Sequence, residues 1–96
     1  MATILTREQA TEALADLPGW ALSDDGTAIS RRWKTRNFAD ALTLTNQVGE
    51  VAEAANHHPD IALGWGYCSV TFTSHDAGGL TNRDIAAAAQ LSGLAP

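Results

Sequence analysis

The chain has one cysteine among its 96 residues, and this scarcity excludes an internal disulfide. A lone cysteine is typical of proteins from a reducing compartment. Cys68 lies in a strand-like run over residues 67–70, and no neighbour in sequence would favour its thiolate. We therefore interpret Cys68 as a structural residue rather than a nucleophile.

Positive charge is also scarce, because six Lys and Arg face 11 Asp and Glu for a net charge of -5. The basic footprint of a nucleic-acid-binding protein is missing. One cationic cluster remains, and we interpret it as a solvated face at a strand end: Arg31, Arg32, Lys34 and Arg36. No stretch approaches the roughly 20 apolar residues of a membrane span, and the N-terminus has no basic start. The sequence predicts a cytoplasmic protein that binds neither membranes nor nucleic acid directly.

What the chain does contain is a normal share of apolar residues, 45%, which is typical of a globular protein. Its length favours one domain over residues 1–96. Periodicity and turn residues predict helices over 6–17, 38–55 and 85–91, and strands over 20–23, 27–33, 61–65 and 69–73. This order, α-β-β-α-β-β-α, indicates an α+β domain in which helices cover one face of a four-stranded antiparallel sheet.

Local signals mark the ends of these elements. Thr6 and Gln9 have the spacing of a capping box, and residues 81–84 repeat that pattern before the last helix. Pro18-Gly19 stops the first helix, while Asp25-Gly26 is typical of a hairpin turn. Asn37 can cap the second helix, whose pattern ends before Pro59. A second hairpin turn is predicted at Gly66-Tyr67.

The second helix has a clear apolar stripe that is poor in large side chains. Gly49 weakens its middle by about 1 kcal/mol relative to alanine, and we hypothesise that it lets another element approach closely. The predicted sheet has two open edges. A lean core and open edges together favour a homodimer or a larger symmetric oligomer.

All three histidines fall between positions 57 and 75. His57 and His58 directly follow the second helix, where the helix dipole favours a cationic imidazole. His75 follows the last strand and has the parity of Thr71 and Thr73. Glu53 lies four residues before His57, a spacing at which side chains share a helical face. Since imidazoles exchange protons near neutral pH, the cluster is a candidate acid/base site.

Spacing alone leaves other interpretations open. A histidine at a helix end is often a cap or a surface residue. A metal site could draw on the histidines with Asp60 and Asp76, although no recognised ligand spacing such as His-Glu-x-x-His is present. A serine hydrolase is weaker still, because Ser69 and Ser74 have no nucleophile-elbow context.

A longer pattern resembles a known family. Glu53 precedes the run His57-His58-Pro59, and Trp65, His75 and Asp84 follow in order. This pattern looks like the signature of the pterin-4a-carbinolamine dehydratases, and the stretch over residues 73–84 is similar to that family's second half. The resemblance covers nearly the whole chain. Departures such as Asn56, where aspartate is common, do not remove a signature residue.

The resemblance implies a fold, an activity and an assembly. Family members dehydrate 4a-hydroxytetrahydropterin to quinonoid dihydropterin, which recycles the tetrahydrobiopterin used by aromatic amino acid hydroxylases. The implied fold has the element order predicted above. Family members are homodimers or homotetramers, and they need neither a metal nor another cofactor.

Roles for single residues follow from the resemblance together with the chemistry of each side chain. The predicted catalytic residues are His57, His58 and His75. We predict that His57 and His75 act as acid and base, and that His58 binds and orients the substrate and can share in proton transfer. Glu53 is predicted to orient His57. Asp84 can cap the last helix, serve the site, or do both. Trp65 alternates with Ile61 and Leu63, so it is predicted in the core or in a pocket wall rather than stacked on the substrate.

Two rival functions remain. A non-catalytic dimerisation or assembly-partner module can use the same fold, but a dedicated binder would be expected to lose the histidines. A metal-dependent hydrolase would need a stoichiometric metal.

Overall fold

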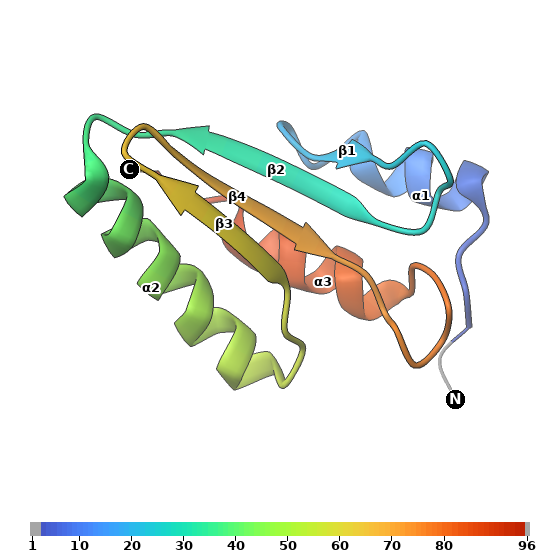
Figure 1. Ribbon diagram of the computed structural model, residues 1–96. Coiled ribbons are helices and arrows are strands. Elements are labelled where there is room, and N and C mark those ends of the chain that lie inside the picture. The colour runs from blue at the N-terminus through green and yellow to red at the C-terminus, as the bar shows by residue number, and fades with distance from the viewer. Residues whose placement is uncertain (1–2, 96) are drawn as a thin grey trace.

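The computed structural model describes residues 3–95. Within them, three helices and four strands follow the predicted order. The elements are α1 (Arg7–Leu14), β1 (Ala21–Leu22), β2 (Ile29–Lys34), α2 (Phe38–Ala55), β3 (Asp60–Gly64), β4 (Tyr67–Phe72) and α3 (Asn82–Leu91). The strands form one antiparallel sheet in the order β1-β2-β4-β3, which the helices cover on one face (Figure 1). The predicted α+β fold is confirmed.

The core lies between the sheet and the helices. Strand β4 is central, and its alternation buries Cys68, Val70 and Phe72 on the helix side. Leu44 and Val48 of α2 join the same cluster, as do Ala87, Ala88 and Leu91 of α3. Because Cys68 is fully buried, the structure agrees with its interpretation as a structural residue.

The predicted caps are present, but several boundaries differ. Thr6 and Gln9 form the expected capping box, yet α1 ends at Leu14 rather than at residue 17. Turns then carry the chain to Trp20, whose backbone N–H donates to the carbonyl of Leu17. The missing turn of helix is replaced by a compact loop that still buries Leu17.

The second hairpin turns one residue earlier than predicted. Its turn is Trp65-Gly66, and Tyr67 begins β4. Thr35 binds this turn at both carbonyls, through its N–H at 3.0 Å from Gly66 and its hydroxyl at 3.2 Å from Trp65. Gly64 faces the Tyr67 ring so closely that a Cβ would lie 2.5 Å from a ring carbon. A side chain at residue 64 would therefore displace the Tyr67 ring.

The cationic cluster does not form one face. Arg31 lies over the Trp33 ring at 4.5 Å, whereas Arg32 lies over Tyr67 at 4.0 Å. Arg36 pairs with Asp40 at 2.8 Å. The alternation of β2 separates these charges, so the expectation of a single solvated face is wrong for the half-buried Arg31.

Gly49 does not have the role suggested for it. A Cβ at this position would meet nothing within 4 Å, so no element among residues 3–95 uses the space. In the part of the chain that the structure describes, no helix is both long enough and apolar enough to cross a membrane.

Helix α2 ends in a left-handed cap. Asn56 has φ 51° and ψ 41°, a conformation that Asn and Gly adopt more readily than other residues. This cap reverses the chain directly before the histidine pair. Its geometry therefore decides where His57 and His58 lie.

We expect Asn56→Gly to preserve the free energy of unfolding, and Asn56→Ala to lower it by about 1 kcal/mol because a Cβ is disfavoured at positive φ. Urea denaturation measures both. Ala55→Gly is the matched control: it should cost about 1 kcal/mol, because residue 55 is helical. An Asn56→Ala variant as stable as the parent would contradict the prediction.

Candidate active site

The histidine pair lies at one end of the β3–β4 hairpin. After the Asn56 cap, the backbone N–H of His57 donates to the carbonyl of Ala52 at 3.1 Å. The chain then passes Pro59 and enters β3. Asp60 pairs with Thr71 in the sheet, so the segment before β3 and the segment after β4 leave the hairpin at the same end. The antiparallel register therefore brings His57 and His58 toward the loop that carries His75.

His57 is buried, with 9% of its surface exposed. Its Nε2 lies 2.6 Å from Oδ1 of Asp84, and its ring stacks on Phe72 with centroids 5.6 Å apart and an interplanar angle of 15°. The two atoms are within hydrogen-bonding distance, and an ionised Asp84 would only accept in this contact. The stacking and the hydrogen bond together hold the ring in one orientation.

Asp84 is fully buried in the first turn of α3. Its Oδ2 accepts from the N–H of Thr81 at 2.9 Å and from the hydroxyl of Ser74 at 2.8 Å, while Oδ1 faces His57. The predicted capping role of Asp84 is therefore confirmed, and its role in the site stays a prediction. One oxygen completes the capping box of α3, and the other holds His57.

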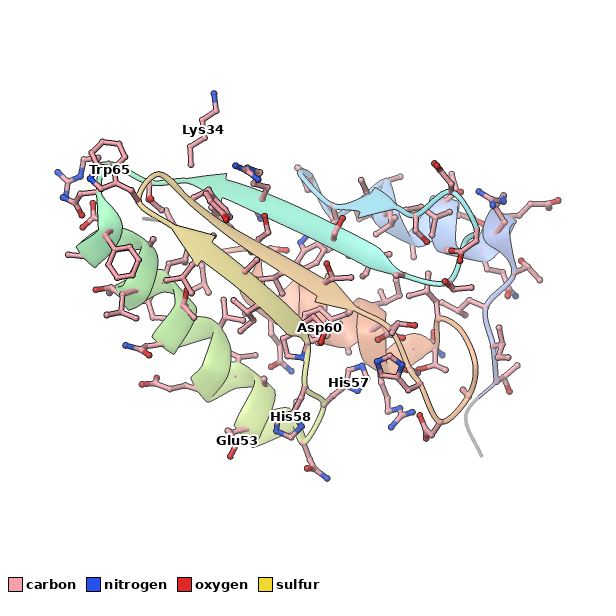
Figure 2. The ribbon with its side chains drawn as sticks, viewed as in Figure 1. Lys34, Glu53, His57, His58, Asp60 and Trp65 are labelled. Atoms are coloured by element: carbon pink, nitrogen blue, oxygen red, sulfur yellow. The ribbon has the colours of Figure 1, made fainter. Side chains whose placement is uncertain are left out.

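His58 points away from the core toward solvent (Figure 2). Its Nε2 bonds Oε2 of Glu53, and the two side chains are 56% and 76% exposed. The prediction that Glu53 orients His57 is wrong: Glu53 pairs with His58, and Asp84 takes the position at His57. The cause is the left-handed cap at Asn56, which turns His57 inward off the helical face it would otherwise share with Glu53.

His75 is exposed in the loop after β4. A bridge between Ser74 and Gly79 closes this loop, and Gly78 has φ 81° within it. Asp76 bonds Arg83 at 2.6 Å, and this hydrogen bond holds the pKa of the Asp76 carboxyl below its usual value. The residue that follows His75 in this loop is therefore a carboxylate, Asp76, which is paired with Arg83 of α3.

Trp65 lies at the opposite end of the hairpin from the histidines (Figure 2). It is 70% exposed, so the prediction that places it in the core is wrong. It does not line the histidine site of its own chain either. The reason is that β3 ends at Gly64, which puts Trp65 in the turn rather than on the alternating strand.

An open groove runs beside α2, lined by Thr45, Asn46, Gly49, Glu50, Glu53 and Ile61. Of the candidate site residues only Glu53 reaches it, so the groove adjoins the His58–Glu53 pair rather than His57. Within residues 3–95, no three His, Cys, Asp or Glu side chains converge as a metal site would require.

Residues 3–94 match the family model described as pterin 4 alpha carbinolamine dehydratase. The chain belongs to this family. A relative from Paracoccus denitrificans is 48% identical over 90 residues, which cover 94% of this chain and 84% of the relative. One from Koribacter versatilis is 41% identical over 96 residues, the full length of both chains. Both carry the name pterin-4-alpha-carbinolamine dehydratase, with the activity marked as provisional.

Two solved structures share the fold of this chain. A transcriptional coactivator/pterin dehydratase from Brucella melitensis has a TM-score of 0.90 and 32% identity, covering 98% of this chain and 100% of its own. A pterin dehydratase-like RuBisCO assembly factor of the alpha-carboxysome has a TM-score of 0.64 at 19% identity, covering 77% of this chain and 86% of its own. The second likeness shows the fold alone.

Sequence reasoning missed two contributors to this dehydratase-family site, Ser74 and Phe72. Ser74 has no hydrolase motif around it, and the pattern around Phe72 predicts only the strand over residues 69–73. The capping-box spacing of Thr81 and Asp84 was a usable signal for the buried carboxylate. No local pattern indicated that a serine ten residues earlier in the chain would bond the same carboxylate.

The two carboxylate–imidazole pairs should differ in their effect on stability. We expect Glu53→Ala to lower the free energy of unfolding by no more than about 1 kcal/mol, because both partners are largely exposed. Asp84→Ala should cost about 3–5 kcal/mol, because it leaves buried donors without an acceptor. Chemical denaturation of both variants measures the difference. Equal costs would contradict the distinction between the buried and the exposed pair.

Proposed function

We propose that this chain catalyses the dehydration of 4a-hydroxytetrahydropterin to quinonoid dihydropterin. The observation that carries the proposal is the buried His57–Asp84 pair, 2.6 Å apart, at the same end of the hairpin as the exposed His75. Membership of the pterin-4-alpha-carbinolamine dehydratase family supports it. The reaction class, a loss of water assisted by proton transfer, suits two imidazoles.

The reaction needs two proton transfers and no change of oxidation state. The C4a–O bond breaks as the hydroxyl takes up a proton and leaves as water. The N5–H bond breaks as its proton goes to a base, and its electrons form the C4a=N5 double bond. The balance requires one acid and one base, so neither a redox cofactor nor a metal is part of the proposal.

His57 is suited to one of these transfers. Its Nε2 proton is committed to Asp84, which leaves Nδ1 as the nitrogen that can take up or release a proton. A buried carboxylate behind the ring stabilises the imidazolium that forms when Nδ1 takes a proton. His57 is therefore a proton carrier with a fixed orientation.

His75 supplies the second transfer, and His58 binds the substrate. Because its loop is exposed, His75 can approach a bound pterin from solvent. The exposed His58–Glu53 pair offers polar groups to which the pterin can bind. In this division of roles, Glu53 orients His58. Asp84 positions His57, and Trp65 has no part in the chemistry of its own chain.

We also propose a homodimer or homotetramer, because β1 and β3 leave the two sheet edges open and Phe38, Leu42 and Trp65 are exposed. In this proposal the protein works in the cytoplasm, where an aromatic amino acid hydroxylase produces its substrate. Size-exclusion chromatography with light scattering measures the assembly.

The activity is tested by the decay of a freshly made 4a-hydroxytetrahydropterin. We expect His57→Ala and His75→Ala each to lower kcat by about 10²- to 10⁴-fold, the usual contribution of a general acid or base. His58→Ala should raise KM more than it lowers kcat, because its role is binding. Stopped-flow absorbance follows the reaction.

Thr11→Ala, an exposed change on α1, is the control and should leave kcat and KM unchanged. Rates like those of the parent in both His57→Ala and His75→Ala would refute the assignment of the site. A parent protein that does not accelerate the decay would refute the enzyme, and would favour the non-catalytic partner module of the same fold.

A further inference from the structure

Ser74 joins the two histidines to which the proposed function gives proton transfers. It is buried, with 1% of its surface exposed, and directly precedes the exposed His75. Its hydroxyl lies 2.8 Å from Oδ2 of Asp84, the carboxylate that holds His57. Neither the family signature nor any motif in the sequence assigns a role to Ser74.

The direction of each hydrogen bond in this cluster follows from counting protons. Ser74 has one hydroxyl proton, and it donates that proton to Asp84. The hydroxyl of Thr81 lies 2.9 Å from that of Ser74, so Thr81 must donate in that contact. Thr81 Oγ1 in turn accepts from the N–H of Arg83 at 3.2 Å. Each hydrogen bond in this series, from Arg83 through Thr81 and Ser74, is therefore donated in the direction of Asp84.

This arrangement gives Asp84 the environment of an anion. Oδ2 accepts from two donors, the hydroxyl of Ser74 and the N–H of Thr81, and Oδ1 remains for His57. Both contacts at Oδ2 place a donor, and no acceptor, against the carboxylate. An ionised carboxylate only accepts, so the Nε2 atom of His57 is obliged to donate.

The backbone of Ser74 acts on the second histidine. Its carbonyl accepts from the N–H groups of Ala77 and Gly78, each at 3.0 Å, and its own N–H donates to Gly79 at 3.1 Å. These bonds close the loop that carries His75. The same residue thus anchors the His75 loop through its backbone and contacts the His57 carboxylate through its side chain.

We propose that Ser74 is a positioning residue whose hydroxyl, backed by Thr81, keeps Asp84 an acceptor and so holds His57 in the Nε2–H tautomer, with Nδ1 as the proton-exchanging nitrogen. The proposal rests on the proposed function where it concerns turnover. Its claim about the tautomer of His57 stands on the hydrogen bonds alone.

The first measurement is nitrogen-15 NMR of the histidine rings in the parent protein, at a pH where His57 is neutral. We expect Nε2 of His57 to carry the proton, with an Nε2–H signal protected from exchange, and Nδ1 to be unprotonated. An Nδ1–H tautomer would overturn the proposal. This result does not depend on any variant or on dehydratase activity.

The second measurement removes the hydroxyl. Ser74→Ala should lose the protected Nε2–H signal and populate both tautomers of His57. It should lower kcat by about 10- to 100-fold with little change in KM, the effect expected when a hydrogen bond to a buried charge is deleted. Ser74→Thr keeps a hydroxyl and should recover the Nε2–H signal and most of kcat.

Thr73→Val is the matched control. It deletes a half-buried hydroxyl one residue away, which donates to the carbonyl of Thr27 outside this cluster. It should leave the His57 signals and kcat unchanged. A Ser74→Ala variant with the tautomer and kcat of the parent would overturn the proposal. An inactive parent with the expected tautomer would refute the dehydratase while supporting the positioning role of Ser74.

Discussion

The structure around the histidines depends on one buried carboxylate. Placing a charge out of contact with water is costly unless hydrogen bonds compensate it. Asp84 is compensated by His57, Ser74 and Thr81, which come from the end of α2, the end of β4 and the start of α3. Because each donor is needed, these three segments are held in one relative position. The hydrogen bonds that build the site thus also fix the first turn of α3, while the apolar core holds the rest of that helix.

Two imidazoles that are adjacent in sequence have opposite environments as a result. His57 is stacked on Phe72 and tied to a buried anion, so its ring has one orientation. His58 pairs with Glu53 in solvent, where such a pair contributes little to stability and can rearrange around a ligand. A fixed imidazole thus lies beside one that can move, an arrangement that fits the different roles proposed for His57 and His58.

The β3–β4 hairpin separates the site from a second exposed region. The histidine segments leave the hairpin at one end, and Trp65 lies at the other. Trp65 is tied to the end of β2 by Thr35, and its ring remains in solvent. With this exposure, Trp65 adds little to the packed core of its own chain.

The sequence by itself determined the element order, the caps at Thr6, Asn37 and Thr81, and the family, because these depend on local periodicity, capping chemistry and ordered spacing. It also predicted which histidines form the candidate site. Only the tertiary structure decided their partners. Because of the left-handed turn at Asn56, His57 contacts Asp84 and His58 contacts Glu53. The β3–β4 turn begins one residue earlier than predicted, so Trp65 lies in the turn and outside the core. Ser74 was beyond prediction, since its contact with Asp84 exists only once α3 has packed against the end of β4.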